Sequence, residues 1–451
     1  MRIREVGVRA ACSLCAAVTV AALAGAPAVA QPTTDRPSTS APAPGAPPTP
    51  GNTSPPIGGP STTPPFTTPN TDDCPQKTQP PAPIDTSEVP APGDPTPSPL
   101  PVPSPAIGGQ RMGDCGVVVP DDAPPVPAEI SATSWMVADL DTGRVLAAKD
   151  PHGRYRPAST IKVALAIVAL RSLDLDDVVI GTQADADVEG TKVGIGPGGR
   201  YTNRQLLQAL IMCSGNDAAH AIATQLGGDK ATVAKMNDLA KTLRASDTRA
   251  STPSGLDGPG SSISAYDLAV LFREAMSIPL FAELIHTEQA DFPGFPADPK
   301  IPGDKDHPGF PIGNDNQLLY NYAGAIGGKT GFTDDARQTF VAAAERDGHR
   351  LVVTLLKADV RPIRPWEQAA RLLDYGFALD TDARIGKLPE IGSEAVQPSV
   401  PLASPPPRAD GSRDDSVRPA HEGARIATLI GGPLLVVVLL LWARRAFRRR
   451  R

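Results

Sequence analysis

The chain has 451 residues, a length that usually accommodates more than one domain, but its composition reduces the part that can form a hydrophobic core. Of its 52 prolines, 29 lie between residues 31 and 130, and aromatic residues make up only 4% of the chain. A large part is therefore predicted to be linker. The formal net charge of −6 is modest, and no basic run is interleaved with aromatic residues, which argues against a nucleic-acid partner.

The N-terminus has the three parts of a secretory signal peptide, predicted over residues 1–30. Three arginines within the first nine residues precede the apolar or small residues 10–23, and residues 28–30 form an Ala-Val-Ala cleavage site. The mature chain is expected to start at Gln31. Its first segment, residues 31–128, is rich in Pro, Thr, Ser, Ala and Gly, which predicts an extended, mostly disordered spacer with polyproline II character.

The cysteines indicate one disulfide. Two of the five cysteines leave with the signal peptide, and export places the others in an oxidising compartment, where a pair can bridge. Cys74 and Cys115 both lie in the proline-rich segment and are predicted to pair, whereas Cys213 lies in an apolar helix and is expected to be a free buried thiol. No cluster of Cys and His has zinc-site spacing, so the sequence predicts neither a metal nor a cofactor.

The folded part is predicted over residues 129–383 as a mixed α+β domain. Strands are expected at 134–140 and 144–149, which form a hairpin, and again at 338–346 and 349–356. Because strands occur at both ends with helices between them, the sheet should be built from distant segments. One expected helix follows Ser159, and others cover residues 203–213, 233–243, 265–276 and 365–377; a further helix follows residues 214–219 and ends at residue 226. Residues 181–204, 252–257 and 286–317 are expected to be loops or irregular.

The C-terminal part has the pattern of a membrane anchor. Residues 384–424 are rich in Pro and Ser, which predicts a linker. Residues 426–443 form an apolar stretch of 18 residues, just long enough for a bilayer, and an arginine-rich tail follows. By the positive-inside rule, residues 425–451 are predicted to be a transmembrane helix with a cytoplasmic tail, which holds the folded domain on the outer side of the cell membrane.

The chemistry is predicted to centre on Ser159 and Lys162. Residues three apart on a helix lie on the same face, so this spacing places a hydroxyl beside an amine. A serine hydroxyl becomes a strong nucleophile only when a neighbouring base takes its proton. Lysine can be that base when burial or a second cation lowers its pKa, and the apolar residues 163–170 provide burial. Ser-x-x-Lys alone arises by chance about once in a chain of this length, so the motif needs support from other residues.

Two further motifs follow in chain order. Residues 214–216 (Ser-Gly-Asn) provide a second hydroxyl and an amide where one predicted helix ends and the next begins. Residues 329–331 (Lys-Thr-Gly) precede the C-terminal hairpin, and the glycine permits a close approach to a ligand. Each tripeptide alone is more typical of a turn or a strand end, but the three motifs in this order in an exported chain point to a common site.

With these motifs the chain resembles the penicillin-binding D-alanyl-D-alanine carboxypeptidases of low molecular weight (peptidase family S11), within the superfamily of serine β-lactamases and penicillin-binding proteins. Supporting matches include Thr-Pro-Ser-Gly-Leu-Asp at residues 252–257. The resemblance covers residues 130–380, and the flanks rich in Ala, Pro and Arg resemble those of actinobacterial members. It implies an antiparallel sheet flanked by helices, a mainly helical subdomain, and an active site between them.

The resemblance also implies a role for each motif residue. Ser159 would be the acylated nucleophile, Lys162 its base, and Ser214 a relay of protons to the leaving D-alanine. The substrate-binding residues would be Asn216 for the substrate amide, Lys329 and Thr330 with the adjoining Gly331 for the terminal carboxylate, and the backbone N–H groups of Ser159 and Phe332 for the oxyanion. Some enzymes of this kind use an additional arginine for the carboxylate, and Arg361 and Arg364 are candidates.

The implied activity is removal of the terminal D-alanine from peptidoglycan stem peptides through a Ser159 acyl-enzyme, in cell-wall remodelling, with β-lactam antibiotics acylating the same serine. Three alternative functions compete with this one. A class A-like β-lactamase would need a Glu-x-x-Leu-Asn type of loop between Asn216 and Lys329, and the sequence contains none. A DD-transpeptidase differs only in the acyl acceptor, and a non-enzymatic wall-binding protein would be expected to lack a motif residue. The sequence does not specify the oligomeric state.

Overall fold

The structure, a computed structural model, describes residues 66–380 and 382–392. The predicted signal peptide and the predicted membrane span at residues 426–443 lie outside this part of the chain, so both stay predictions. Within the described ranges, no helix combines the length and the hydrophobicity that crossing a membrane requires.

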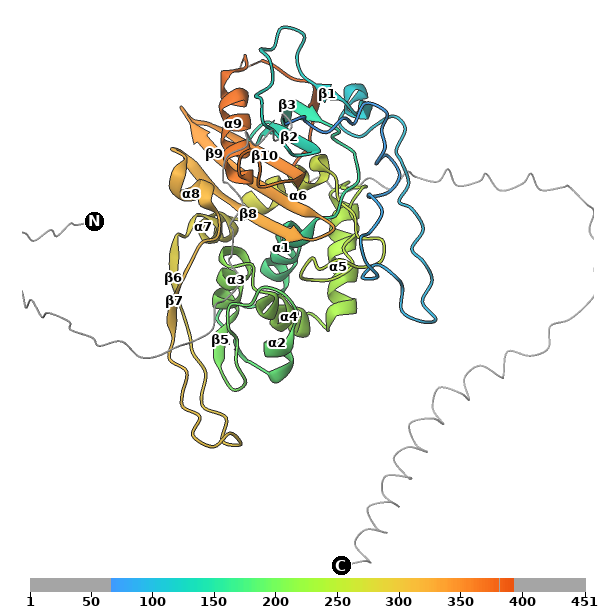
Figure 1. Cartoon of the computed structure of the whole chain (residues 1–451). Coiled ribbons are helices and arrows are strands. Elements are labelled where there is room, and N and C mark those ends of the chain that lie inside the picture. Colours follow the sequence, from blue (N-terminus) through green and yellow to red (C-terminus); the bar gives the residue numbers. More distant parts are fainter. Residues whose placement is uncertain (1–65, 381, 393–451) are drawn as a thin grey trace, which may run out of the picture. The chain divides into compact units, whose positions relative to one another are not determined.

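A seven-stranded antiparallel sheet forms the centre of the fold, with the strand order β1-β3-β2-β10-β9-β8 and with β11 also paired to β3 (Figure 1). The two predicted hairpins are confirmed, because β2 pairs with β3 and β9 with β10. β10 joins the hairpins by pairing with β2, so the sheet does combine distant segments. The strands are β1 (Val117–Val118), β2 (Ser134–Asp139), β3 (Arg144–Lys149), β8 (Ala325–Thr333), β9 (Arg337–Arg346), β10 (His349–Ala358) and β11 (Gly386–Lys387).

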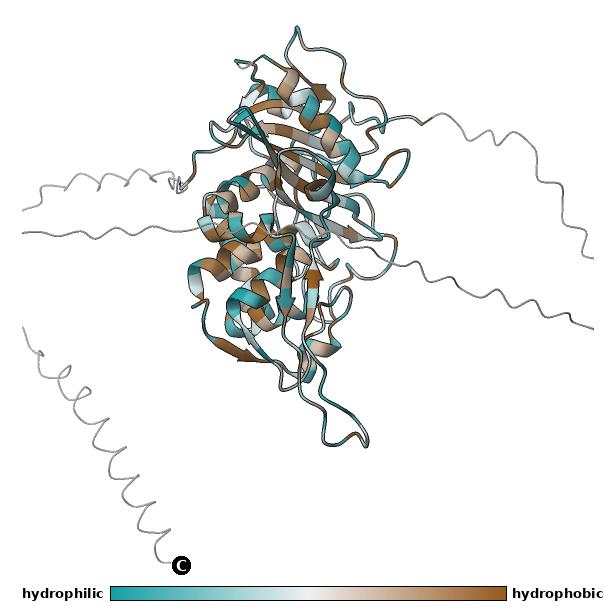
Figure 2. Cartoon of the chain, turned by 90° about the vertical axis from the view of Figure 1, so that its left-hand side faces the viewer, coloured by the Kyte–Doolittle hydropathy of each residue, from teal (hydrophilic) through white to brown (hydrophobic). Residues whose placement is uncertain are grey.

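Side chains alternate along the strands and build a core on each face of the sheet. On β2, Trp135 and Val137 face a core that also contains Leu372 of α9 (Pro365–Ala378). Met136 and Ala138 face the second core, where α6 (Ala265–Met276) packs on the sheet. Figure 2 shows apolar residues on the strands and on the helices beside them. The sheet is therefore a middle layer with helices on both faces, as the resemblance implies.

A mainly helical part lies beside the sheet in Figure 1. The helix predicted at residues 265–276 has the same bounds as α6. Two segments predicted as loops contain short strands. β5 (Arg200–Thr202) pairs with β4 (Val178–Ile180), which lies just before the first segment, and β6 (Gln289–Phe292) pairs with β7 (Phe310–Gly313) within the second. Gly and Pro signals in these segments obscured strands of only three or four residues. The other helices are α1 (Lys162–Ser172), α2 (Gln183–Asp187), α3 (Asn203–Met212), α4 (Asn216–Gln225), α5 (Asp229–Thr242), α7 (Pro279–His286) and α8 (Gln317–Asn321).

Residues 66–116, here called the strap, require a correction. They were predicted to be part of a mostly disordered spacer, but they follow the surface of the domain in defined positions and include η1 (Gln110–Gly113). The predicted disulfide is confirmed, because Cys74 and Cys115 are bonded with a Cα–Cα distance of 5.2 Å. The sheet also extends beyond the predicted boundaries of 129 and 383, since β1 and β11 both pair with β3.

The buried guanidinium of Arg154 explains why a proline-rich chain docks here. Prolines lack an N–H group, so the carbonyls of such a chain need donors from elsewhere. Arg154 Nη1 donates to the Thr78 and Leu100 carbonyls at 2.8 and 2.6 Å, and Nη2 donates to the Pro101 carbonyl at 2.7 Å. Its Nε and Nη2 each donate to Asp247 Oδ1 at 3.1 Å. Five donors are thus matched by five hydrogen bonds.

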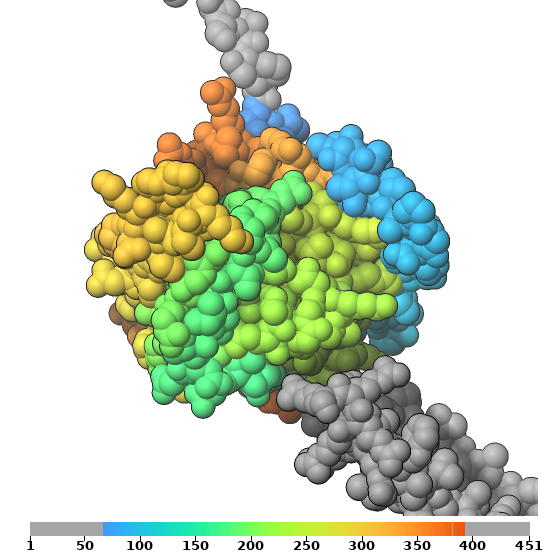
Figure 3. All heavy atoms as spheres, turned by 90° about the horizontal axis from the view of Figure 1, so that it is seen from below, coloured from blue at the N-terminus to red at the C-terminus, as the bar shows by residue number. Residues whose placement is uncertain are grey.

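Further polar contacts hold the strap along one side of the domain, where Figure 3 shows it in blue. These contacts pair Arg156 with Glu88, Lys149 with the Pro69 carbonyl, Arg249 with the Ser98 carbonyl at 2.8 Å, and the Ile84 N–H with Asp335 Oδ1 at 2.7 Å. Composition did not predict this docking, because it depends on cations and carboxylates that lie far away in the sequence.

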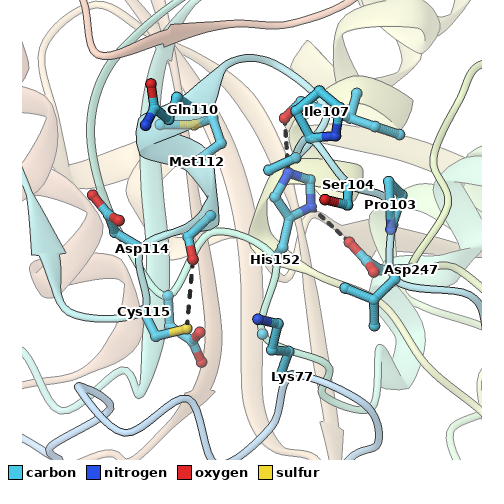
Figure 4. Close-up of a pocket in the computed structure, with 16 residues that line it drawn as sticks. Lys77, Pro103, Ser104, Ile107, Gln110, Met112, Asp114, Cys115, His152 and Asp247 are labelled. Atoms are coloured by element: carbon cyan, nitrogen blue, oxygen red, sulfur yellow. Dashed lines mark hydrogen bonds and ion pairs between the residues drawn. The ribbon is translucent and has the colours of Figure 1, made fainter.

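A cavity of about 260 Å³ lies between the strap and the domain and contains none of the predicted catalytic residues (Figure 4). His152 lines it and bridges the two parts, because Nδ1 lies 2.7 Å from Asp247 Oδ2 and Nε2 lies 2.9 Å from the Ile107 carbonyl oxygen. Burial lowers the pKa of His152, but the bond to Asp247 and the nearby carboxylates outweigh burial, so its pKa is raised. Because both partners accept hydrogen bonds, the protonated imidazole fits this position best.

Candidate active site

Ser159 lies in a short 3-10 turn, η2 (Ala158–Ile161), that leads directly into α1. The preceding residue, Ala158, has a φ of 47°, in the left-handed region that non-glycine residues rarely adopt. Such strain is typical of functional sites. Ser159 is partly exposed and Lys162 is completely buried. The predicted proximity is confirmed, because Lys162 Nζ lies 2.8 Å from Ser159 Oγ.

The Lys162 amine makes two further hydrogen bonds. One goes to Asn216 Oδ1 at 2.7 Å, and the other goes to the backbone carbonyl of Ser254 at 2.5 Å. The first contact joins the Ser-x-x-Lys motif to the Ser-Gly-Asn motif through Lys162 Nζ. The second contact comes from the Thr-Pro-Ser-Gly-Leu-Asp segment, which the sequence marked as a match without assigning it a role.

Electrostatics favour an unprotonated Lys162. Burial lowers its pKa well below the ordinary value, the charge of Lys329 lowers it further, and Asp217 opposes both effects. Burial also lowers the pKa of Lys329, to about 8, against the charge of Asp315. At neutral pH Lys329 therefore keeps its charge while Lys162 tends to lose its proton. This agrees with the expectation that burial or a second cation lowers the pKa of Lys162.

The Ser-Gly-Asn motif forms the turn between α3 and α4. Ser214 has a φ of 57° and is 7% exposed, and Asn216 is the first residue of α4. Asn216 Nδ2 donates to the Glu189 carbonyl at 2.7 Å, which requires the amide nitrogen on that side and the oxygen on the side of Lys162. The two neighbours of its side chain thus set the amide orientation of Asn216.

Asp217 is a residue of this site that the sequence reasoning missed. It is completely buried, and its carboxylate accepts hydrogen bonds from the backbone N–H groups of Val193, Gly194, Ile195 and Ala218 at 2.8 to 3.0 Å. It thereby ties the preceding loop to the start of α4, and this loop also supplies the carbonyl that orients Asn216. An aspartate directly after a Ser-Gly-Asn motif at a helix start could have been suspected from its N-terminal position.

The Lys-Thr-Gly motif lies on β8, at the end of the sheet, where no other strand of residues 66–380 and 382–392 pairs with the outer edge of β8. Lys329 is buried and donates to the Thr330 carbonyl at 2.7 Å, and Phe332 is 50% exposed. A Cβ atom at Gly331 would lie 2.9 Å from the Ser159 nitrogen and 2.3 Å from Thr339 Oγ1. The glycine therefore lets the strand approach the backbone of η2, where the sequence predicted a close approach to a ligand.

Three other predictions concern residues around the site. Arg361 and Arg364 lie exposed in the connection between β10 and α9, and their role in carboxylate binding stays a prediction. Cys213 is free, as predicted, but it is only half-buried, with Sγ 3.4 Å from the Gly313 carbonyl oxygen. The expected burial is wrong because α3 ends one residue before Cys213, so the cysteine lies in the turn instead of the apolar helix.

Comparison with known proteins places these residues in a family. The family described as D-alanyl-D-alanine carboxypeptidase, peptidase S11, matches residues 121–360. The D-alanyl-D-alanine carboxypeptidase DacB2 of Mycobacterium tuberculosis is 49% identical over 275 residues, which cover 60% of this chain and 90% of that protein. DacD of Escherichia coli is 34% identical over 289 residues, or 60% of this chain and 70% of that protein.

Solved structures agree with the sequence comparisons. A crystal structure of D-alanyl-D-alanine carboxypeptidase from Mycobacterium tuberculosis is 48% identical, has a TM-score of 0.55, and is matched over 100% of its length and 60% of this chain. The Streptomyces K15 DD-transpeptidase is 29% identical with a TM-score of 0.52, over 100% of that chain and 57% of this one. The fold, the convergence of the three motifs and these likenesses show that the chain belongs to the S11 family of serine D-alanyl-D-alanine carboxypeptidases.

Proposed function

We propose that this protein removes the terminal D-alanine from peptidoglycan stem peptides, with Ser159 as the nucleophile and Lys162 as its base. The observation that carries the assignment is the contact of 2.8 Å between Lys162 Nζ and Ser159 Oγ. Burial and the charge of Lys329 lower the pKa of this lysine, so its amine can accept a proton near neutral pH.

In the acylation step, Ser159 Oγ forms a bond to the carbonyl carbon of the penultimate D-alanine while its proton passes to Lys162 Nζ. The N–H groups of Ser159 and Phe332 stabilise the oxyanion, and one such donor contributes about 3 kcal/mol in comparable enzymes. When the C–N bond breaks, the proton passes through the Ser214 hydroxyl to the leaving amine, and free D-alanine departs.

In the deacylation step, a water molecule attacks the acyl carbon while Lys162 takes one of its protons. The bond between the acyl carbon and Ser159 Oγ breaks, and the proton returns to Oγ. The shortened peptide leaves as a carboxylic acid, and the enzyme regains its starting state. The same serine would be acylated by β-lactam antibiotics, whose strained amide replaces the peptide bond.

The position of β8 at the end of the sheet supports the assignment of a peptide substrate. A peptide can add to an unpaired strand edge through backbone hydrogen bonds. Lys329 is buried and retains a positive charge below about pH 8, which suits a terminal carboxylate. Lys329 and Thr330 would bind the terminal carboxylate, and the Phe332 N–H would bind the oxyanion. The substrate would then lie along β8 and pass Asn216.

We also propose that the protein acts outside the cytoplasm and is held at the cell membrane by residues 425–451. The signal-peptide pattern, the apolar stretch at 426–443 and the arginine tail support this location. The disulfide between Cys74 and Cys115 is consistent with an oxidising compartment. We expect the full chain to sediment with membranes and a chain that ends at residue 392 to stay in solution.

The function is tested on the full chain by labelling with a fluorescent penicillin and by D-alanine release from a stem pentapeptide. We expect native protein to label stably and to release D-alanine, and Ser159→Ala to do neither. Absence of labelling in folded native protein would overturn the assignment. Labelling without release of D-alanine, but with product formation when an amine acceptor is added, would instead indicate a DD-transpeptidase.

A further inference from the structure

The hydrogen bonds around Lys162 determine where its lone pair points. A neutral amine has two N–H groups and one lone pair, and three oxygen atoms lie within 2.8 Å of Nζ. The Ser254 oxygen is a backbone carbonyl and can only accept a hydrogen bond. Asn216 Oδ1 can only accept as well, because the Glu189 carbonyl fixes the amide orientation.

These two acceptors use both N–H groups of the neutral amine. The lone pair is then left for the third neighbour, Ser159 Oγ, which can donate its proton. If the Ser254 carbonyl were absent, one N–H of Lys162 could instead turn toward Ser159, and the lone pair would point away from the proton it has to take. The Ser254 carbonyl therefore complements Asn216 in setting the direction of proton transfer.

A tight turn holds this carbonyl in place. Thr252 Oγ1 accepts a hydrogen bond from the Gly255 N–H at 3.0 Å and donates one to the Leu256 carbonyl at 3.1 Å. Gly255 has a φ of +87°, and a Cβ atom there would lie 2.0 Å from the Ala158 carbonyl oxygen. The turn thus packs directly against the strained residue before the nucleophile, so its position is coupled to that of Ser159.

We propose that the turn of residues 252–256 is a positioning element of the reaction, in which Thr252 and Gly255 hold the Ser254 carbonyl so that the lone pair of Lys162 faces Ser159 Oγ. This inference rests on the proposed function of Ser159 and Lys162. It assigns a role to the Thr-Pro-Ser-Gly-Leu-Asp segment, and it makes the Thr252 hydroxyl a determinant of acylation although that hydroxyl is not among the contacts of the amine.

The test compares two variants of one residue in the full chain. Thr252→Val keeps the shape but removes the oxygen that binds the Gly255 N–H, and Thr252→Ser keeps that oxygen. The measurement is the second-order rate constant of acylation by a fluorescent penicillin as a function of pH, with thermal unfolding as the control for folding. A misplacement of about 1 Å at a reacting group can cost about 100-fold in rate.

We expect the plateau rate of Thr252→Val to fall about 10- to 100-fold and that of Thr252→Ser to stay within about threefold of native. The acid limb of the pH profile should stay in place or move to lower pH, because the protonated amine loses an acceptor. A merely structural loosening would admit water, weaken the burial of Lys162 and move the limb to higher pH.

A native-like rate in folded Thr252→Val would overturn the proposal, and so would a rate loss with the limb moved to higher pH. If Thr252→Val is too unstable, Thr252→Ala is measured in the same way. Unfolding of both variants alongside an intact Thr252→Ser would show that the turn is needed for folding and not for placing one carbonyl. Labelling that persists in Ser159→Ala would refute the proposed function itself, whereas native-like Thr252 variants would refute only this inference.

Discussion

Arg154 under the strap and Lys162 in the active site are both buried cations, and they have opposite surroundings. Arg154 has five N–H donors and makes five hydrogen bonds to carbonyls of the strap and to Asp247. Lys162 has two obligate acceptors and a hydroxyl, with a second buried lysine nearby. An arginine does not lose its proton in a protein, whereas a buried lysine does so readily.

The difference shows how the fold uses positive charge in two ways. Where every donor finds an acceptor and a carboxylate is at hand, the cation is a structural anchor. Where the amine is completely buried and another cation is near, the charged form is disfavoured and the group becomes a base. Exchanging the two residue types is therefore the sharpest test of the comparison.

The largest effect is expected for Lys162→Arg. The variant keeps a cation but cannot take up the proton of Ser159, and general-base catalysis is worth about 100- to 10,000-fold. We expect penicillin acylation to fall about 1,000-fold, measured by fluorescent labelling, with Lys192→Arg on the surface as the matched control. Retention of more than a tenth of the native rate in a folded variant would contradict the role of Lys162 as the base.

The reverse exchange, Arg154→Lys, should break the anchor instead of the chemistry. Lysine keeps the charge but offers three donors in place of five, so carbonyls of the strap lose their partners. We expect a loss of about 2–3 kcal/mol in unfolding free energy, measured in urea, and easier proteolysis of the strap. Arg249→Lys, which affects one bond to Ser98, should cost less than about 1 kcal/mol. Equal losses of unfolding free energy in Arg154→Lys and Arg249→Lys would contradict the role of Arg154 as the anchor of the strap.

Asp217→Asn should weaken the site without touching the base directly. One amide oxygen cannot replace a carboxylate that accepts four N–H groups, so the loop that orients Asn216 should loosen. We expect the plateau rate of acylation to fall about tenfold. The loss of a negative charge should also move the acid limb of the pH profile to lower pH. An unchanged rate and limb would contradict this assignment, and Asp187→Asn on the surface is the control.

The pH profile of the carboxypeptidase reaction should have an alkaline limb near pH 8. Lys329 must be charged to attract the terminal carboxylate, and burial lowers its pKa to about 8. Above this pH, kcat/KM for a stem pentapeptide should fall about tenfold per pH unit as the charge is lost. The same peptide with an amidated C-terminus lacks the carboxylate, so it should show no such limb. A limb of equal depth for both peptides would rule out this role of Lys329.

The smallest effect is expected from His152 under the strap. Despite burial, its bond to Asp247 raises the pKa of His152, and the carboxylates of Asp247 and Asp267 face it while the Tyr266 ring packs beside it. Its contribution to stability is complete below the unfolded value of about 6.5 and is lost as pH rises through the folded-state pKa. The decline of thermal stability above neutrality should therefore be shallower in His152→Gln than in native protein. An equal decline of thermal stability with pH in both proteins would contradict the role of His152 as a bridge between the strap and the domain.

The three motifs predicted most of the active-site residues, because the reaction requires particular residue types at short spacing. Ser159 in η2 and Lys162 at the start of α1 are three residues apart, so their contact follows from local geometry alone. Asp217 and the Ser254 carbonyl could not be found in the same way. Asp217 acts through backbone N–H groups of a loop more than 20 residues away, and a backbone carbonyl has no sequence signature at all.

The strap shows what composition alone does not predict. The position of its two cysteines in an exported chain predicted the pairing of Cys74 with Cys115, which is confirmed. Composition could not predict order, because the order comes from Arg154, Arg156 and His152, whose partners lie 45 to 76 positions away in the sequence.

The sequence by itself determined the hairpins, the helix that follows the nucleophile, the three motifs and the family to which they belong. These features depend on local periodicity, turn residues and the reactivity of particular side chains. Only the tertiary structure decided which atoms surround the Lys162 amine and which donors satisfy the proline-rich strap. The physical reason is that a buried cation interacts with whatever acceptors the fold brings within about 3 Å of it, and many of these are backbone carbonyls that every residue possesses.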